Sequence, residues 1–361
     1  MSERIVVALS GGVDSAVAAL LLRRAGHEVQ GLHMTNWEDD EAGYCTAAAD
    51  WQSARSVATE LGIVLHRVSF TAEYREQVFK HFLADYAAGL TPNPDILCNR
   101  EVKFGVCLEY AQRLGGQQLA TGHYARIVQD SDGSARLYRA RDTNKDQSYF
   151  LQAMPSAALR LAAFPLGDTL KDEVREHARR AGLPVHDRPD STGICFIGER
   201  PFREFLQHYL QGARGPIETR SGEVLGYHDG LMYHTIGQRQ GLKIGGLRHG
   251  SNAPWYVAAK DVTRNALIVV QGQDHPALFT QSFSTAIPVW LQRHETRFAE
   301  CHVQVRHRQH AVACTVQMAA GGAEVSLCAP LRGVAPGQYA AFYAGDECLG
   351  GAPIVDVARL S

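Results

Sequence analysis

One segment near the N-terminus limits the fold more than any other. An apolar stretch from Arg4 to Leu9 is followed by Ser10-Gly11-Gly12-Val13-Asp14-Ser15 and then by an amphipathic pattern over Ala16–Arg24. Glycines let backbone N–H groups turn toward a bound anion, and the start of a helix adds a positive dipole, so the segment predicts a phosphate-binding loop between a strand and a helix. No Walker A lysine follows, which sets it apart from the usual kinase or GTPase loop. A tight turn with capping residues is the alternative interpretation.

The rest of the first half repeats this order of strand and helix. Alternation of short apolar segments with amphipathic ones predicts a parallel sheet with helices on both faces. A helix near Lys171–Ala181, stopped by Gly182 and Pro184, closes the region. The expected strands are Arg4–Leu9, Glu28–His33, Leu65–Ser69 and Gln118–Ala120, and the other expected helices are Ala16–Arg24, Ala47–Leu61, Glu73–Ala88 and Glu101–Leu114.

From about residue 210 onward, short alternating strands and Gly-rich turns replace the helices. The change predicts a β-rich second half, made of one small domain and one barrel. We therefore expect three domains, over residues 1–208, 209–276 and 277–361. The expected strands include Val224–Tyr227, Trp255–Ala259, Ala266–Val270, His302–His307, Ala311–Met318 and Glu324–Leu327, with turns at Gly321-Gly322 and Pro336-Gly337.

The net charge and the lengths of the apolar runs indicate which classes of protein the chain can belong to. The net charge is −2, with −4 over residues 1–200 and +2 over residues 201–361. The more positive second half is at most a weak hint of a polyanionic partner, because nucleic-acid-binding surfaces are usually far more basic. The sequence has no apolar run long enough to cross a bilayer and no basic leader with a cleavage site. We expect a cytoplasmic protein that does not enter a membrane.

Two of the eight cysteines lie in segments that suggest chemistry. No Cys-x-x-Cys pair occurs, so neither a zinc nor an iron–sulfur site is indicated, and we expect no metal bound by the protein alone. In Asn93-Pro94-Asp95-Ile96-Leu97-Cys98-Asn99 a carboxylate and a thiol share a predicted loop, where Asp95 could relay a proton and Cys98 could act as a nucleophile. An Asx-type turn that ends in a buried cysteine is the alternative.

The second segment is Asp190-Ser191-Thr192-Gly193-Ile194-Cys195-Phe196-Ile197-Gly198, directly after the last expected helix. Ligands gather at the carboxyl ends of the strands in such a sheet, and the loops of Cys98 and Cys195 should meet there. Two thiols in one place could pass sulfur between them. Two unrelated buried cysteines are the alternative, and the polar loop of Cys45 leaves the role of that residue open.

The six-residue loop resembles the PP-loop of N-type ATP pyrophosphatases, which attach AMP to a carbonyl oxygen and release pyrophosphate. That resemblance covers the first domain alone and fits GMP synthetase, NAD synthetase, argininosuccinate synthetase, lysidine synthetase and the tRNA thiolases.

Six motifs in one order narrow the resemblance to the tRNA-specific 2-thiouridylase family, over essentially the full length. These are Ser10–Ser15, Asn93–Asn99, Thr121-Gly122-His123-Tyr124-Ala125-Arg126, Lys145-Asp146-Gln147-Ser148-Tyr149-Phe150, Asp190–Gly198 and Thr235-Ile236-Gly237-Gln238-Arg239.

The resemblance implies a set of site residues. Cys98 would be the nucleophile, Cys195 the persulfide carrier, and Asp95 a catalytic residue that contacts the target base. ATP would be bound by Ala8, Leu9, Ser10, Gly11, Gly12, Val13, Asp14, Ser15, Met34 and Gly122, and tRNA by Asn93, Pro94, Asp95, His123, Lys145, Asp146, Gln147, Arg306, His307 and Gln338.

The family chemistry explains why ATP and two thiols are needed. The C2 carbonyl of uridine has no leaving group, so adenylation of its oxygen makes AMP the leaving group, with Mg²⁺ neutralising the triphosphate. A persulfide sulfur on Cys195 then attacks C2. Cys98 either attacks the inner sulfur to release the product, leaving a Cys98–Cys195 disulfide, or liberates sulfide for the attack.

The resemblance also implies partners. The substrate would be the wobble uridine of the lysine, glutamate and glutamine tRNAs, flipped out of its stack. A cysteine desulfurase or another sulfur-relay protein would charge Cys195, and we expect a monomer. The competing hypotheses are a small-molecule PP-loop synthetase, a tRNA thiolase of the iron–sulfur type, and a non-enzymatic tRNA-binding protein.

Overall fold

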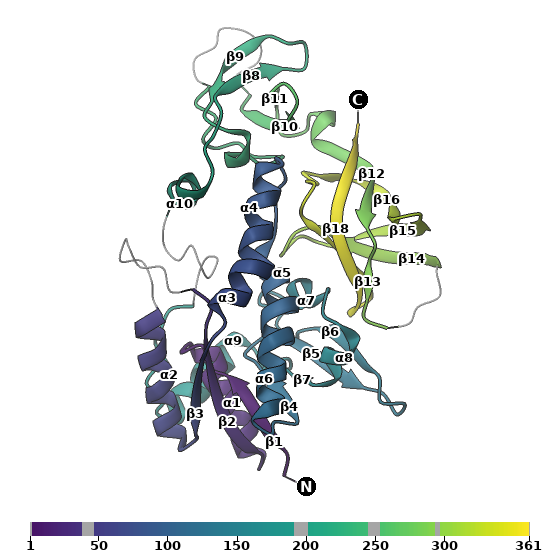
Figure 1. Cartoon of the computed structure of the whole chain (residues 1–361). Helices are drawn as coiled ribbons and strands as arrows, with labels where there is room; N and C mark the ends of the chain where they lie inside the picture. Colours follow the sequence, from purple (N-terminus) through teal and green to yellow (C-terminus); the bar gives the residue numbers. More distant parts are fainter. Residues whose placement is uncertain (1, 38–46, 191–200, 245–252, 293–296, 361) are drawn as a thin grey trace.

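A computed structural model describes residues 2–37, 47–190, 201–244, 253–292 and 297–360, which form three β-sheets (Figure 1). The first sheet is parallel, with the strand order β3-β2-β1-β4-β7. Its strands are β1 (Arg4–Ala8), β2 (Glu28–Thr35), β3 (Leu65–Ser69), β4 (Gln118–Ala120) and β7 (Ala162–Ala163). The expected α/β class is confirmed.

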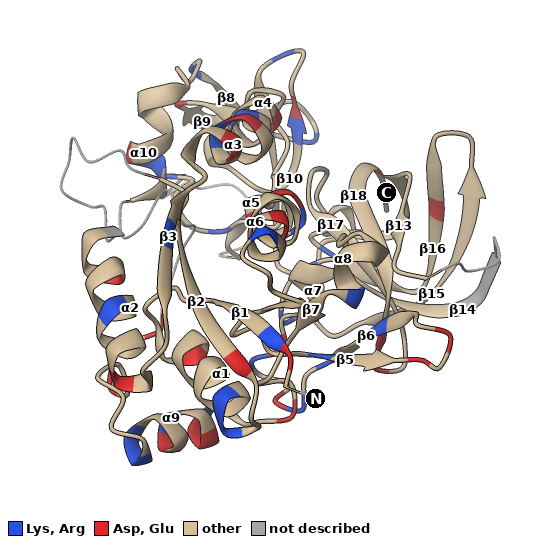
Figure 2. Cartoon of the chain, turned by 60° about the horizontal axis from the view of Figure 1, so that its bottom comes forward, with Lys and Arg blue, Asp and Glu red and all other residues tan. Residues whose placement is uncertain are grey.

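Helices cover both faces of this sheet because successive strand side chains point to opposite sides. Ile5 and Val7 of β1 pack in one apolar core with α1 (Val13–Arg24), α2 (Ala47–Leu61) and α9 (Lys171–Arg180), which lie on the same side of the sheet (Figure 2). Val6 and Ala8 pack in a second core on the other face, with helices between residues 71 and 113. These helical segments are α3 (Thr71–Tyr74), the π-helical turn η1 (Arg75–Phe79), α4 (Lys80–Ala87), α5 (Pro94–Leu97), the π-helical turn η2 (Cys98–Val106) and α6 (Cys107–Arg113).

The sheet order also locates the crevice where ligands bind in such folds. The chain runs from β1 to β2 and β3 on one side and continues with β4 and β7 on the other. The strand order reverses between β1 and β4, so the loops after these two strands border the expected binding crevice.

One prediction about local structure was wrong. Residues 93–99 were expected to form a loop, but Pro94–Leu97 is helical and continues into η2. The physical reason is that Pro94 occupies the first turn, where its missing N–H needs no partner and its fixed φ suits a helix. The later helix is also not regular, because Gly105 interrupts it with φ −104° and ψ −109°.

A small sheet with the order β10-β11-β8-β9 forms the middle of the chain. It is preceded by α10 (Phe202–Tyr209), whose Phe205 and Phe202 contact Phe79 and Tyr86 of the long helical segment at ring-centroid distances of 6.1 and 5.4 Å. The elements of this region are β8 (Gly215–Thr219), β9 (Val224–His228), the 3-10 turn η3 (Leu231–Tyr233), β10 (Trp255–Asp261) and β11 (Ala266–Gln271).

The last sheet is an antiparallel barrel, as expected. Its strands follow the order β12-β16-β15-β14-β17-β18, and pairing of β12 with β18 closes it. Its elements are the 3-10 turn η4 (Pro276–Leu278), β12 (Phe279–Ala286), β13 (Val289–Trp290), β14 (Arg297–Gln304), β15 (Val312–Ala319), β16 (Gly322–Arg332), β17 (Tyr339–Ala344) and β18 (Glu347–Arg359).

A hairpin from the first half joins this barrel, which the sequence pattern had not predicted. The strands β5 (Ala125–Gln129) and β6 (Ala135–Arg139) extend the barrel sheet, because β6 pairs with β18 through Tyr138 and Glu347. Apolar residues of the first half and of the barrel consequently share one core. Two short helices follow the hairpin, α7 (Ser148–Leu151) and α8 (Ser156–Arg160). Over the described ranges, no helix is both long and apolar enough to cross a bilayer.

Candidate active site

The loop between β1 and α1 has the hydroxyl and amide groups of an anion site. Ser15 Oγ accepts a bond from the Ser10 amide at 3.2 Å, donates to the Gly12 carbonyl at 3.1 Å and lies 3.1 Å from Ser10 Oγ. Gly11 has φ +86°, and a Cβ there would lie 2.4 Å from the Asp50 carbonyl oxygen. Only glycine fits this position.

The loop after β4 lies directly against the start of α1. A Cβ on Gly122 would lie 2.7 Å from the Ser15 amide nitrogen and 2.8 Å from the Asp14 carbonyl carbon. Gly122 therefore lets two backbone segments approach each other at the crevice. The predicted role of Gly122, letting a nucleotide approach the backbone, stays a prediction.

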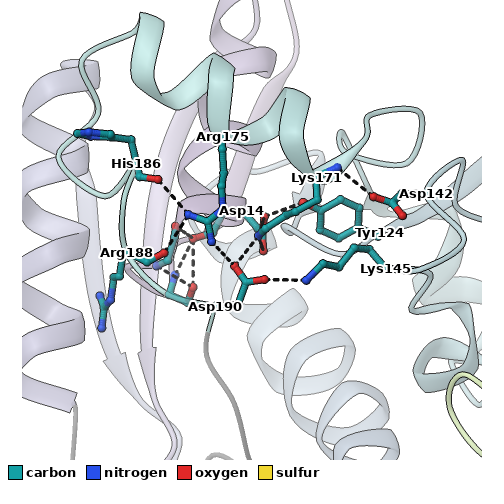
Figure 3. A network of polar contacts seen from close by, with 12 residues as sticks. Asp14, Tyr124, Asp142, Lys145, Lys171, Arg175, His186, Arg188 and Asp190 are labelled. Atoms are coloured by element: carbon teal, nitrogen blue, oxygen red, sulfur yellow. Dashed lines mark hydrogen bonds and ion pairs between the residues drawn. The ribbon is translucent and has the colours of Figure 1, made fainter.

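Asp14, at the first turn of α1, is held from two sides (Figure 3). The Tyr124 hydroxyl donates to Asp14 Oδ1 at 2.8 Å, and Lys171 Nζ lies 2.7 and 2.9 Å from the two carboxylate oxygens. Burial and the adjacent Asp14 carboxylate raise the pKa of Tyr124, so its hydroxyl stays protonated as a donor.

Asp190 is the last described residue before the segment that carries Cys195, and three cations surround it (Figure 3). Lys145, Lys171 and Arg175 place nitrogen atoms 2.7, 2.8 and 2.8 Å from its carboxylate oxygens. Partial burial opposes ionisation, but the hydrogen bonds from Lys145 and Lys171 outweigh it and lower the pKa of Asp190 to about 2. Asp190 is ionised at any physiological pH.

Asp95 and Cys98 lie on the short helix α5 and at its C-terminal cap. Burial raises the pKa of the Asp95 carboxyl group, while Lys103 and His307 act in the opposite direction. The Cys98 side chain is only 3% exposed. Residues Cys45 and Cys195 fall outside the described residues, so the predicted meeting of Cys98 and Cys195 stays a prediction.

The end of β2 carries buried polar groups that have no hydrogen-bond partner among the described residues. Within the described residues, Thr35 Oγ1 and Asn36 Oδ1 are buried without a hydrogen bond. The side chain of Met34, the predicted neighbour of adenine, packs against the apolar core. Buried polar atoms normally find a partner, so this strand end is suited to a polar ligand.

The surroundings of His123 favour the neutral form of its imidazole ring. Its Nδ1 lies 2.7 Å from Thr121 Oγ1, and the ring lies between Phe104 and Phe164 at centroid distances of 6.0 and 5.8 Å. Burial, with a smaller effect of Lys103, lowers the pKa of His123 well below the ordinary histidine value. Any contact of His123 with RNA would therefore involve an uncharged imidazole.

The predicted tRNA-binding residues Asp146 and Gln147 also hold the chain together. Asp146 is buried, and its carboxylate accepts bonds from the Ala140 amide at 3.0 Å, from the Ser148 hydroxyl at 2.9 Å and from Arg139 at 3.0 Å. Gln147 Oε1 accepts from the Tyr124 amide at 3.0 Å. Through Tyr124, Gln147 supports the group that donates to Asp14.

In the barrel, the three predicted tRNA-binding residues link segments of the fold. Arg306 donates to the carbonyl oxygens of Ile236 and Gly333, at 3.1 and 2.6 Å. His307 Nε2 lies 3.0 Å from the Asp146 carbonyl oxygen, and burial lowers its pKa.

Gln338 Nε2 donates to the Thr91 carbonyl oxygen at 2.7 Å, just before the residues Asn93 and Pro94. The barrel is thereby tied to α5. A cavity of about 640 Å³ lies beside this junction and is bordered by Asn93, Leu97 and Arg100. Neither Asp95 nor Cys98 borders this cavity.

Sequence patterns had missed Lys171 as part of the site. The helix near Lys171–Ala181 was predicted, but a lysine in the first turn of a helix looks like any solvated charge. The signal that could have found it is a phosphate loop without its own cation, which requires one from elsewhere in the chain.

Comparison with known proteins covers nearly the whole chain. The family models described as tRNA methyl transferase HUP domain, tRNA methyl transferase PRC-barrel domain and Aminomethyltransferase beta-barrel domain match residues 3–199, 203–271 and 280–354. The tRNA-specific 2-thiouridylase MnmA of Chromohalobacter salexigens is 53% identical over 354 residues, which cover 97% of this chain and 92% of that protein. The protein of the same name from Hahella chejuensis is 50% identical over 358 residues, covering 99% and 98%.

Likeness to solved structures is much weaker. The NMN synthetase of Francisella tularensis matches with a TM-score of 0.34 and 19% identity, over 56% of this chain and 72% of that one. A match at this level supports no conclusion about function.

Proposed function

The chain belongs to the tRNA-specific 2-thiouridylase family, and from this premise we propose that it replaces the C2 oxygen of a tRNA wobble uridine by sulfur, at the expense of ATP. The observation that carries the proposal is the combination, in one chain, of this relationship with a phosphate loop at the β1–β4 crevice and the Asp95–Cys98 pair on α5. The enzyme is an ATP-dependent sulfurtransferase.

The ATP site proposed is the crevice between the β1 and β4 loops. The hydroxyl groups of Ser10 and Ser15 and the amide groups at the start of α1 suit phosphate oxygens, and the buried atoms Thr35 Oγ1 and Asn36 Oδ1 suit the nucleoside. Asp14 supplies carboxylate oxygens of the kind that Mg²⁺ prefers. When bound, Mg²⁺ would neutralise part of the triphosphate charge.

The phosphate loop and Gly122 would hold the nucleotide while the uridine oxygen attacks the α-phosphorus. Asp95, as a buried carboxyl group with a raised pKa, is suited to transfer a proton at the base. Sulfur would come from a persulfide on Cys195. In one route its terminal sulfur attacks C2 and displaces AMP, and Cys98 then attacks the inner sulfur, which releases the thiolated base and forms a Cys98–Cys195 disulfide. In the other route Cys98 attacks the inner sulfur first, which forms the same disulfide and liberates sulfide, and the sulfide displaces AMP. Both routes require the two thiols.

Partners follow from the same proposal. The substrate is tRNA, with the lysine, glutamate and glutamine acceptors proposed, and a cysteine desulfurase or relay protein would supply sulfur. We propose residues 1–208 as the catalytic domain, 209–276 as the central domain and 277–361 as a tRNA-contacting domain of a cytoplasmic monomer. The matches of separate models to 3–199, 203–271 and 280–354 support this division.

Competing functions predict different products. A small-molecule PP-loop synthetase would also release AMP and pyrophosphate, but it would not depend on tRNA. The family-model description names a methyl transferase, which would add a methyl group to the nucleoside and would need no ATP cleavage.

The decisive experiment is mass spectrometry of nucleosides from tRNA of cells that lack the protein. We expect 2-thiouridine derivatives to disappear and to return with the intact gene. In vitro, the purified protein should form AMP and pyrophosphate from ATP only when tRNA is present. Unchanged 2-thiouridine, or ADP and phosphate as products, would overturn the proposal.

A further inference from the structure

The residues of the phosphate loop carry no positive charge that could offset the charge of a triphosphate. A triphosphate carries several negative charges, and the leaving pyrophosphate gains more as its bond to the α-phosphorus breaks. The sequence holds no lysine or arginine between Arg4 and Arg23, so the loop residues themselves offer amides and hydroxyls but no cation. A cation from elsewhere in the fold would complete the site.

Lys171 comes to the loop from the first turn of α9, far along the chain (Figure 3). Its side chain is 10% exposed, and its ammonium group bridges Asp14 of the phosphate loop and Asp190, at 2.7 and 2.8 Å. The ammonium group also lies 5.8 Å from the centre of the Tyr124 ring. Lys171 therefore contacts the side chain of a loop residue, while Arg188 donates to the carbonyl oxygen of Gly11 at 2.8 Å.

Hydrogen bonds hold the backbone of Lys171 in place, while its ammonium group is shared between the carboxylates of Asp14 and Asp190. The Asp142 carboxylate accepts a bond from the Lys171 amide at 3.0 Å, and the Glu173 carboxylate accepts one from the Leu170 amide at 2.8 Å. These bonds hold the first turn of α9 in place. The flexible four-carbon stem lets the ammonium group exchange one carboxylate for a phosphate oxygen without moving the helix.

Asp190 does not depend on Lys171 alone. Lys145 and Arg175 contact the same carboxylate, at 2.7 and 2.8 Å. If Lys171 turns to a phosphate, Asp190 keeps two cations, and Asp14 keeps the Tyr124 hydroxyl at 2.8 Å. No carboxylate is left without a partner by the exchange, which keeps its cost low.

We propose that Lys171 is a catalytic residue that binds the β- and γ-phosphates of ATP and stabilises the departing pyrophosphate. This inference rests on the proposed function. In the adenylation step, a bond forms between the uridine O2 and the α-phosphorus, and the bond from that phosphorus to the bridging oxygen breaks. The electron pair leaves on pyrophosphate, where the Lys171 ammonium group offsets the added charge without giving up a proton.

The experiment measures the dissociation constants of ATP and AMP by calorimetry, with magnesium, in the full chain without tRNA. Lys171→Met should weaken ATP binding by about tenfold or more, the usual range for a lost charge-assisted bond, and leave AMP binding within about twofold. Lys171→Arg should retain most of the ATP affinity because it keeps the charge. The matched control is Lys80→Met, which removes another ion-paired lysine, one that contacts Glu76 at 2.7 Å on the exposed side of α4.

Two results would overturn the inference. One is ATP affinity in Lys171→Met equal to that of the unchanged protein. The other is an equal loss of ATP and AMP affinity together with a lower thermal midpoint, which is what a purely structural partner of Asp14 would produce. If the unchanged protein bound no ATP, the proposed function would fail instead, so the two failures can be told apart.

Discussion

A buried carboxyl group such as Asp95 lowers stability when it is ionised. Because burial raises its pKa, the folded state resists ionisation more than the unfolded state does. The stability conferred by the protonated form is therefore lost as the pH rises from the unfolded value, near 3.8, through the raised folded pKa. At neutral pH this residue costs stability, which favours a chemical reason for its presence.

We predict that Asp95→Asn raises the thermal midpoint at neutral pH and flattens its dependence on pH. The neutral amide keeps the shape of the side chain but avoids the cost of ionisation. It cannot transfer a proton, so thiolation should fall by about a hundredfold or more. Circular dichroism across a pH series and nucleoside mass spectrometry would check both effects. Normal thiolation with the variant would exclude Asp95 as the proton-transfer group.

The cysteines provide a second prediction for single residues. Cys98→Ser and Cys195→Ser should each abolish thiolation, because a hydroxyl neither carries a persulfide nor resolves one. Cys328→Ser is the matched control, since Cys328 is exposed in the barrel. A labelled persulfide donor should mark Cys195 in Cys98→Ser without reaching tRNA. Thiolation at a normal rate in Cys195→Ser would identify another carrier, with Cys45 as the next candidate.

At the scale of elements, the approach of the β4 loop to α1 decides the shape of the ATP site. Gly122→Ala would place a methyl group 2.7 Å from the Ser15 amide, against backbone that cannot turn away. We predict loss of ATP affinity by about tenfold or more, from displacement of the amides that should bind phosphate.

Gly226→Ala is the control for this variant, because a Cβ at Gly226 meets nothing within 4 Å. Calorimetric titration with ATP would compare the two variants. Equal affinities would mean that the β4 loop can shift without disturbing the phosphate loop.

Helices whose apolar residues recur at a clear helical period were predicted well. Segments whose secondary structure depends on tertiary contacts were not. Helix α2 begins and ends at the predicted residues Ala47 and Leu61, because its apolar positions recur at the helical period. The helical form of residues 94–97 was missed, because its Asn-Pro-Asp start is equally typical of a turn. Burial of Ile96 in the core favours the helix there.

At the scale of the whole molecule, the barrel and the first sheet are not independent. Strand β18 pairs with β6, and Tyr149 donates to the Tyr339 carbonyl oxygen at 3.1 Å. Tyr343 of the barrel, with its buried ring, belongs to the same apolar core as Val6 of the first sheet.

We predict that a chain ending at residue 275 loses stability and ATP affinity as well as tRNA affinity. Truncation exposes the core face that Tyr339 and Tyr343 cover, at a cost of about 25 cal/mol for each Å² of apolar surface. Thermal denaturation and ATP titration of the truncated chain would test this. Loss of tRNA binding alone, in a gel-shift titration at fixed salt, would instead show that the barrel is a separable RNA-binding domain.

The sequence by itself determined the α/β class, the β-rich second half and the position of the loop between β1 and α1, because these depend on local periodicity and on short motifs. Only the tertiary structure decided that β5 and β6 join the barrel and that Lys171 meets Asp14. Such contacts join residues more than a hundred positions apart, and a lysine that will complete a site has the same local sequence signal as one that faces water. The physical difference between the two lies in the partners that the fold brings to them.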